Sequence, residues 1–333
     1  PNAIGIVLIP SVSEKFADGE RFSNLRGYLT KTNHIFSVIM PVYNGSFYMH
    51  EALDSLLAQT FSEWELIIVD DASTDSTPAI IEEYCGKDSR IRTLRNECNL
   101  SPGPSNNRGI EKARGRWMAH LDVDDRYRPD FLKRLHDFCA PLGEPNLFVT
   151  TLVCVIDETG QRVLDLRLPG SKKTQKMITI ENCIFHTATL FPKKLWLEGS
   201  RYPENIRGRD DVSLWQQFLK KGARLEVLPE ILAEYRIHYQ NLTYGVDGHD
   251  TKTSFNAIKK CAEWKVSLLL KQGQTNEARQ ELQKILTNPK YASPKNIAYY
   301  LMTYLPAPIV SYFMWEIRSN VRHFFRDWKE GRP

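Results

Sequence analysis

The sequence predicts an α/β protein built around a doubly wound sheet. Short apolar runs of strand length alternate with segments whose apolar residues recur at helical spacing, which is the pattern of parallel strands joined by helices. Aspartate-rich clusters follow directly after several of the strand-like runs. Ligands of such sheets bind beyond the carboxyl ends of the strands, so we expect the binding site where these clusters lie.

The regular alternation begins near residue 36. Strands are expected at residues 36–40, 65–69, 91–94 and 116–121. Helices are expected between them at residues 47–58, 76–84 and 104–113, the second with Ser76 as its N-cap. This order of strand and helix is what predicts parallel strands in this half of the domain.

After residue 125 the alternation is less regular. The remaining expected elements are a helix over residues 129–140, strands over 147–156 and 188–191, an amphipathic helix over 211–221, and strand-like runs over 224–228 and 232–236. From about residue 251 only helical periodicity remains, with a helix-turn-helix around residues 271–276. We therefore expect an extension over 1–33, an α/β domain over 34–248 and a helical region over 249–333.

Composition narrows the class of protein. The hydrophobic content of 42% is that of a globular protein, and a formal charge of +4 over 333 residues argues against a dedicated nucleic-acid binder. The six cysteines are widely spaced without a CxxC pair, so neither a zinc ribbon nor a redox motif is expected. Free thiols favour a reducing compartment and hence a cytoplasmic protein. Apolar runs of about 18 residues are absent, so we expect no transmembrane helix.

Three acidic clusters stand at predicted strand ends or loop tips. They are Asp70-Asp71, the run Asp122-Val-Asp124-Asp125, and Asp210-Asp211. Carboxylates in such positions offer oxygen ligands to a hard divalent cation such as Mg²⁺ or Mn²⁺. Each cluster taken alone is equally compatible with a solvated turn or a helix cap. Their convergence on one crevice is the hypothesis that gives them a common chemistry.

Several segments together resemble glycosyltransferase family 2. They are Ser37–Asn44 (SVIMPVYN), Leu56–Thr60, Ile67–Asp75 (IIVDDASTD), Asn107–Ile110, Ala113–Gly115, Leu121–Asp125 (LDVDD), Arg209–Trp215 and Tyr235–His238 (YRIH). The resemblance covers roughly residues 35–245. It implies a GT-A fold, a Rossmann-like mixed sheet flanked by helices, here with a C-terminal helical extension. It also implies an inverting transfer of a sugar from a nucleoside diphosphate.

The resemblance also implies roles for individual residues. The nucleotide would be bound by Pro41, Val42, Tyr43, Asn44, Asp70, Asp71, Asp122 and Arg108. One of the paired aspartates Asp70 and Asp71 would accept a hydrogen bond from the base, typically the N3–H of uracil. Asp124 would bind a divalent cation, Mn²⁺ or Mg²⁺, that neutralises the leaving diphosphate, and His238 would complete the metal site.

The third acidic cluster would then serve the acceptor. Asp211 is the expected general base, which takes the proton of the acceptor hydroxyl. Asp125, Asp210, Arg209 and Trp215 are candidates for contact with the acceptor or the donor sugar. The sequence departs from the family pattern at Asp210, where the family usually has Glu, and at Asn106, where Arg is common. We expect a hexosyl- or N-acetylhexosaminyl-transferase that uses a UDP-sugar and a saccharide or lipid-linked acceptor, in cell-surface polysaccharide or glycolipid synthesis.

The C-terminal stretch adds a possible membrane contact. Residues 309–328 interleave aromatic and aliphatic side chains with basic ones, as in an amphipathic helix that lies on an anionic membrane surface. The same apolar face could instead pack on the α/β domain or on a second subunit. On the first interpretation the protein would be peripheral on the inner face of the membrane.

Three other classes of protein share parts of this pattern. The run Ile67–Asp71 also opens response-regulator receiver domains, but the chain is far too long for one and Asp210-Asp211 would go unexplained. A dinucleotide-dependent oxidoreductase is excluded because no GxGxxG follows the first strand. A non-catalytic nucleotide-sugar-binding module of the same fold remains open, and the presence of Asp124, Asp211 and His238 favours an enzyme.

Overall fold

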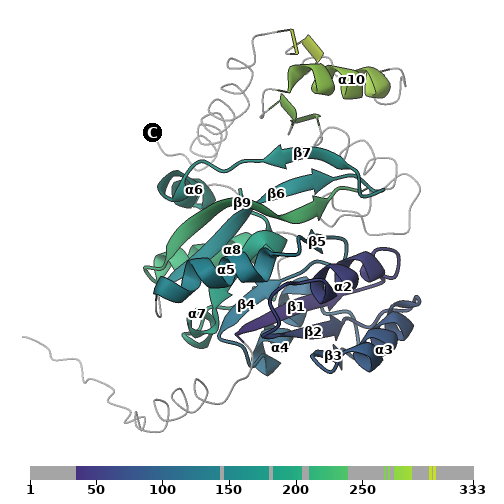
Figure 1. Ribbon diagram of the computed structural model, residues 1–333, viewed down its shortest axis with the longest axis vertical. Coiled ribbons are helices and arrows are strands. Elements are labelled where there is room, and N and C mark those ends of the chain that lie inside the picture. Colours follow the sequence, from purple (N-terminus) through teal and green to yellow (C-terminus); the bar gives the residue numbers. More distant parts are fainter. Residues whose placement is uncertain are drawn as a thin grey trace, which may run out of the picture.

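The computed structural model describes residues 35–142, 146–179, 183–204 and 210–238, and further along the chain 266–267, 269–270, 274–286, 300–301 and 303–304. Within these residues the chain forms a nine-stranded sheet with the order β3-β2-β1-β4-β8-β6-β9-β5, and β7 pairs with β6 (Figure 1). Helices lie on both sides of this sheet (Figure 1). The expected α/β class is confirmed.

The first half of the sheet is parallel, as the alternation predicts. Its strands are β1 (Phe36–Val42), β2 (Trp64–Asp70), β3 (Ile91–Arg95) and β4 (Trp117–His120). β1 pairs in parallel with both β2 and β4, and β2 with β3. The connecting helices are α2 (Met49–Leu57), α3 (Thr77–Lys87) and α4 (Pro102–Lys112). Ser76 is at the N-cap of α3 as expected, but it makes no side-chain cap bond, and Asp75 Oδ1 instead accepts from Thr77 N at 3.0 Å.

The second half makes the sheet mixed. β8 (Thr189–Pro192) is antiparallel to β4 and to β6 (Leu147–Ile156), which in turn runs parallel to β9 (Arg224–Arg236). Two short strands complete the sheet by antiparallel pairing, β5 (Arg126–Tyr127) on β9 and β7 (Arg162–Leu166) on β6. The mixed sheet implied by the family resemblance is therefore present, and strict doubly wound alternation ends at β4.

Helices of the second half support this mixed sheet. They are α5 (Phe131–Cys139), α6 (Ser171–Ile178), α7 (Lys193–Leu197), α8 (Asp210–Lys220) and α10 (Thr275–Leu286), with 3₁₀ turns at Ala140–Leu142 and His186–Ala188. The sequence analysis did not predict β5, β7, α6 or α7. These elements are short, and α6 is largely polar, so neither a helical nor a strand period stands out in them.

Two hydrophobic layers cover the two faces of the sheet. Along β1, Val38 and Met40 belong to one layer and Ile39 to the other, because side chains of a strand alternate between faces. The first layer contains the apolar faces of α2, α3 and α5, and the second those of α4 and α8. The helices cover the two faces of the sheet. The carboxyl ends of the parallel strands are therefore followed by the polar loops.

The expected runs 224–228 and 232–236 form the single strand β9. Its pairing with β6 is irregular near Leu152, where Leu228 and Ile231 are the successive partners of Thr151 and Leu152. Pro229 stands in the skipped segment and has no N–H for the ladder, which explains the local irregularity. The strand continues without a break to Arg236, and therefore carries the end of the YRIH segment to the edge of the sheet where β4 ends.

The described residues of the C-terminal region pack on the α/β domain. Val266, Leu269, Leu270, Ala278 and Leu282 are buried and belong to the same hydrophobic layer as β6 and β9. The expected extension over residues 1–33 and the amphipathic stretch over 309–328 lie outside the described residues. Every helix within the described residues is too short or too polar to span a bilayer.

A buried carboxylate joins β2 to the neighbouring segments. Glu65 is fully buried and accepts hydrogen bonds from Ser37 Oγ at 2.7 Å, from Arg114 N at 2.5 Å and from Arg92 Nη2 at 2.6 Å. Gly115 N in turn donates to Ser37 Oγ at 2.8 Å. A Cβ on Gly115 would lie 2.6 Å from the backbone nitrogen of Ser37, so the Ala-Arg-Gly segment passes β1 too closely for a side chain.

We therefore expect Gly115→Ala to destabilise the protein by about 1 to 3 kcal/mol, because the backbone of β1 would have to move. Gly86→Ala is the matched control, since a Cβ there meets nothing within 4 Å in α3. It should stabilise the protein by about 1 kcal/mol. Urea unfolding of both variants tests this, and equal stabilities of the two variants would contradict it.

Glu65 should also make stability depend on pH. Burial raises the pKa of Glu65, but the hydrogen bonds from Ser37, Arg114 and Arg92 outweigh it and hold this pKa below the ordinary 4.5. Its ionised form thus stabilises the fold above pH 4.5, and this contribution is lost as the pH falls through the lower folded-state value.

Glu65→Gln should accordingly cost about 2 kcal/mol at pH 7, and the difference from the wild type should shrink below pH 4.5. The exposed neighbour Glu63, changed to Gln, serves as the control. Thermal unfolding at several pH values measures the effect, and a difference that stays constant with pH would rule out this role for Glu65.

Candidate active site

The parallel pairing of β1, β2 and β4 brings the predicted site segments to one edge of the sheet. Val42 at the end of β1 is in register with Asp70 at the end of β2, and Ile39 with His120 at the end of β4. The loops that follow therefore leave the same edge. The first and second acidic clusters leave this edge on either side of β1, as expected from strands that run in one direction.

The end of β1 and the loop after it carry four of the residues predicted to bind the nucleotide. Val42 is buried and its carbonyl accepts from Asp71 N at 2.8 Å, whereas the Tyr43 side chain is 49% exposed. Asn44 adopts a positive φ of 51° and its side-chain oxygen accepts from Thr74 N at 2.8 Å. Pro41 is partly buried in β1 beneath this loop. Of these residues, Tyr43 has a ring that is exposed enough for a nucleotide base to contact.

Both carboxylates of the first pair are already hydrogen-bonded within the protein. Asp70 accepts from Ser73 N at 2.9 Å and pairs with the Arg95 guanidinium. Asp71 accepts from Asn96 Nδ2 at 2.6 Å and from the backbone of Leu100 and Ser101, each at 2.9 Å. The two aspartates thus hold the loop after β3 against the loop after β2. A bound base would have to share an oxygen with these donors.

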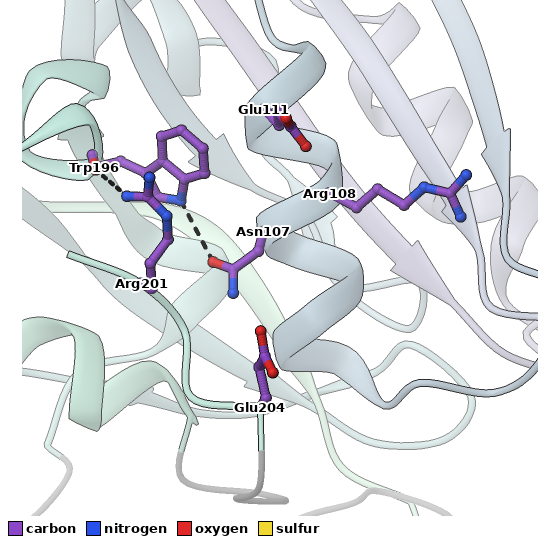
Figure 2. Close-up of a pocket in the computed structure, with 6 residues that line it drawn as sticks. All are labelled: Asn107, Arg108, Glu111, Trp196, Arg201 and Glu204. Carbon is purple, nitrogen blue, oxygen red and sulfur yellow. Dashed lines mark hydrogen bonds between the residues drawn. The ribbon is translucent and has the colours of Figure 1, made fainter. Parts of the chain in front are cut away.

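Arg108 belongs to the same network as Asp71. Its guanidinium donates to the Arg95 carbonyl at 3.0 Å and to Asn96 Oδ1, and Asn96 in turn donates to Asp71. Figure 2 shows the Arg108 side chain extending from α4 to the side opposite Trp196 and Arg201. The contacts support a role in holding the Asp71 loop, and its expected contact with the diphosphate remains a prediction.

The second acidic cluster meets the end of β9. His238 Nε2 lies 2.9 Å from Asp124 Oδ2, and the His238 ring packs on Tyr48 with 4.9 Å between ring centroids. Two ligands on adjacent corners of an octahedral cation, each about 2.1 Å from it, are about 3 Å apart. Asp124 and His238, predicted as metal ligands from 114 residues apart in sequence, are therefore brought together at a fitting distance.

Asp122 lies among side chains that the sequence analysis did not single out. His120 Nε2 lies 2.9 Å from Asp122 Oδ1, and the His120 ring stacks on His186 with centroids 3.4 Å apart. Burial lowers the pKa of His120 to about 3, and burial together with His120 lowers the pKa of His186 well below its ordinary value. Both rings are therefore neutral at pH 7. Burial raises the pKa of Asp122 to about 6, with Asp124 adding repulsion and His186 opposing it.

His120, Asp122 and His186 are also a second group that could hold a metal, since one donor atom from each lies within 4.8 Å of the others. The two rings are nearly parallel, with 17° between their planes. Imidazole lone pairs lie in the ring plane, so those of stacked rings run side by side rather than converge on one ion. This geometry favours Asp124 and His238 as the metal ligands and leaves His120 to orient Asp122. His120 could have been noticed from its place at the end of a strand-like run, whereas no local signal marks His186.

Asp125 faces inward. It is 1% exposed, and its Oδ1 accepts from Arg236 N at 2.8 Å. Burial and the nearby Asp124 and Asp122 raise the pKa of Asp125 well above its ordinary value. The predicted contact between Asp125 and a sugar does not fit this position, so we leave Asp125 out of the proposed site.

The third acidic pair begins α8. Asp210 is buried, and burial together with repulsion from Asp211 and Asp122 raises its pKa to about 7. Asp211 is partly exposed, and its Oδ1 accepts from Val212 N at 2.7 Å. The pKa of the buried Tyr202 is raised well above its ordinary value by burial and by the charges of Asp210, Asp211 and Asp122. The Tyr202 Oη lies 2.6 Å from His186 Nε2, and a Cβ on Gly103 would lie 3.6 Å from the Cβ atoms of both Tyr202 and Asp210.

Of the two remaining predicted sugar-contact residues, the structure describes Trp215 and it does not fit the prediction. Trp215 is fully buried in the second hydrophobic layer and stacks on Phe148 at 5.6 Å. Its ring has no face for a saccharide, because α8 turns this residue toward the sheet. Arg209 lies outside the described residues.

A cleft of about 340 Å³ lies beside α4 (Figure 2). It is lined by Asn107, Arg108, Glu111, Trp196, Arg201 and Glu204. Trp196 is largely buried, and the Arg201 guanidinium lies 3.5 Å from its ring centroid. The lining includes none of the acidic cluster residues and shares only Arg108 with the predicted nucleotide-binding residues.

The chain is similar in sequence to known glycosyltransferases. A model of glycosyl transferase family 2 matches residues 37–195. The glycosyltransferase TuaG of Bacillus subtilis (strain 168), named for teichuronic acid biosynthesis, is 32% identical over 209 residues, which are 63% of this chain and 81% of TuaG. The succinoglycan biosynthesis protein ExoO of Rhizobium meliloti (strain 1021) is 31% identical over 210 residues, 60% of each chain.

Solved structures share the fold at low sequence identity. TarS residues 1–349 of S. aureus, in complex with UDP-GlcNAc, has a TM-score of 0.54 and 19% identity, over 89% of this chain and 92% of that one. The mannosyltransferase PcManGT of Pyrobaculum calidifontis, in complex with GDP-Man and Mn²⁺, has a TM-score of 0.51 and 15% identity, over 89% and 79%. The chain has the mixed, helix-flanked sheet of GT-A glycosyltransferases, and it belongs to glycosyltransferase family 2.

Proposed function

We propose that this glycosyltransferase moves a hexosyl or N-acetylhexosaminyl group from a UDP-sugar to an acceptor hydroxyl, with inversion and with a divalent cation. One chain of contacts carries the proposal, because it links the acids at the end of β4 to the start of α8. Asp122 contacts His120, His120 stacks on His186, and His186 Nε2 lies 2.6 Å from Tyr202 Oη. Tyr202 and Asp210 in turn face the same glycine, since a Cβ on Gly103 would lie 3.6 Å from the Cβ of each. A donor diphosphate held at Asp122 and Asp124 would therefore place its sugar toward Asp211. That is the arrangement that a direct displacement requires.

The proposed step transfers one sugar and one proton. Asp211 accepts the proton of the acceptor hydroxyl as that oxygen bonds to the anomeric carbon, and the bond from this carbon to the diphosphate oxygen breaks. UDP leaves with the electron pair of that bond. A divalent cation, Mn²⁺ or Mg²⁺, would neutralise charge on the diphosphate, and Asp124 and His238 would hold it. The partly exposed Asp211 suits contact with an acceptor better than the buried Asp210.

The donor and the pathway are proposed from the comparisons. TarS was solved with UDP-GlcNAc, and PcManGT with GDP-Man and Mn²⁺, so nucleotide sugars of both bases occur in this fold. TuaG and ExoO are named for the synthesis of teichuronic acid and succinoglycan. We therefore favour UDP-linked sugars, a saccharide or lipid-linked acceptor and a role in cell-surface polysaccharide synthesis, at the cytoplasmic side of a membrane.

A screen tests the reaction directly. Thermal shifts with UDP, GDP and their sugars, each with and without Mn²⁺, should identify a stabilising nucleotide, and UDP release from the matching sugar should follow. Stabilisation without any release of UDP, with a range of saccharide acceptors, would instead indicate a non-catalytic binding module.

The general base is tested by comparing two adjacent residues. Asp211→Asn should lower kcat by about 10²- to 10⁴-fold, because the acceptor proton loses its base, while UDP binding stays within about threefold. Asp210→Asn should retain most of the activity, since Asp210 is buried behind it. Turnover and UDP titration of both variants measure this. Loss confined to Asp210→Asn would assign the base to Asp210 instead.

Substitution of two histidines, His238 and His186, tests the position of the cation. His238→Gln should raise the Mn²⁺ concentration that gives half-maximal activity about 10-fold or more, because it removes a ligand beside Asp124. His186→Gln should change this concentration by less than about threefold. The reverse result would place the cation at His120, Asp122 and His186.

A further inference from the structure

We infer that Arg236 is a positioning residue that sets the geometry of Asp124 for the divalent cation. This inference rests on the proposed function, since it concerns the proposed metal site. Arg236 ends β9 and is fully buried, which is unusual for a charged side chain. Its hydrogen-bond partners explain how this charged side chain is accommodated in the interior.

Two residues at the end of β9 hold the same aspartate. Arg236 Nε donates to the Asp124 carbonyl at 2.9 Å, and His238 Nε2 lies 2.9 Å from the Asp124 side-chain Oδ2. The two residues are two positions apart, and both pack on Tyr48, with the Arg236 guanidinium 4.5 Å and the His238 ring 4.9 Å from its centroid. Asp124 is therefore held at its backbone by one and at its carboxylate by the other.

The guanidinium is itself held in one orientation. Its Nη2 donates to Glu51 Oε2 at 2.6 Å, and its Nη1 lies 3.3 Å from the Asp157 carbonyl and 3.4 Å from that of Glu158. These acceptors come from α2 and from the turn between β6 and β7. Because the guanidinium fork is planar and rigid, fixing two of its nitrogens fixes the direction of the third.

The turn between β6 and β7 is shaped to admit this side chain. Gly160 has a positive φ of 83°, and a Cβ there would lie 3.4 Å from Arg236 Nη1 and 3.1 Å from Arg126 Nη1. A side chain at this position would press on both guanidinium groups. The left-handed glycine thus leaves room for Arg236 to reach the Asp124 loop.

The charge of Arg236 also matches its surroundings. Asp122 and Asp124 lie two residues apart on one loop, and Asp125 Oδ1 beside them accepts from the Arg236 backbone N at 2.8 Å. Mutual repulsion would tend to open this loop when no cation is bound. A fixed positive charge behind the loop opposes that opening, so the oxygen ligands stay arranged for the cation. Lysine would keep the charge, but its single ammonium could not hold these separate acceptors in fixed directions.

Arg126 supplies a matched control. It donates to Glu51 Oε2 at 3.0 Å, to Glu234 Oε2 at 2.8 Å and to the Gly160 carbonyl at 3.1 Å. It therefore shares the partner Glu51 and the same turn with Arg236, while its bonds lead to β9 and α2 rather than to the Asp124 carbonyl.

The test compares Arg236→Lys and Arg126→Lys in the full chain. Mn²⁺ binding in the presence of UDP is titrated by electron paramagnetic resonance, UDP binding is measured in EDTA, and UDP release from UDP-GlcNAc is followed against Mn²⁺ concentration. Arg236→Lys should weaken Mn²⁺ binding about 10-fold or more and leave UDP binding in EDTA within about twofold, with kcat largely restored at saturating Mn²⁺. Arg126→Lys should leave Mn²⁺ binding within about threefold.

The outcomes separate this inference from the proposed function. Unchanged Mn²⁺ binding by Arg236→Lys, or equal weakening by both variants, overturns the positioning role. Wild-type protein that binds Mn²⁺ with UDP but releases no UDP from any sugar overturns the proposed reaction and leaves the comparison of variants valid. Wild-type protein that binds no Mn²⁺ overturns both. Should Arg236→Lys fail to fold, Glu51→Gln, which removes the anchor from its partly exposed side, should weaken Mn²⁺ binding about fivefold or more. A loss no larger than that of Arg126→Lys would then overturn the positioning role.

Discussion

The candidate site depends on the parallel pairing of β1 with β2 on one side and β4 on the other. This register places Val42 beside Asp70 and aligns the end of β4 with the middle of β1, so that three loops leave one edge of the sheet. The apolar layers on both faces hold the strands in that register, because a slip of one residue would move each apolar side chain to the wrong layer. The chemistry of the edge is thus set by packing in the interior.

Several carboxylates lie at that edge of the sheet, and their surroundings are of two kinds. At the first pair, Arg95 and backbone N–H groups take up the charge of Asp70 and Asp71, which makes these residues organisers of the loops. At the second and third clusters, burial raises the pKa values of Asp122 to about 6 and of Asp210 to about 7. Burial thus destabilises these two carboxylates as anions, and a divalent cation beside them would relieve that destabilisation.

Much of the fold could be predicted from periodicity, and the failures have a common cause. The expected strand over residues 147–156 is the observed β6, because ten apolar-rich residues in a row leave little ambiguity. β5 has two residues and β7 five, and their pairing partners are distant in sequence, so local patterns could not reveal them. The same limit applies to His186, which reaches the site only because β8 is antiparallel to β4.

The sequence by itself determined the reaction class, since the ordered motifs identify the family, and it determined which residue types could bind a cation or take a proton. The tertiary structure decided which of them share a site. It paired Asp124 with His238, linked Asp122 to Tyr202 through His120 and His186, and turned Asp125 and Trp215 inward. The physical reason is that a carboxylate's role follows from its burial and its neighbours. Those are set by strand register and helix packing between segments that are far apart along the chain.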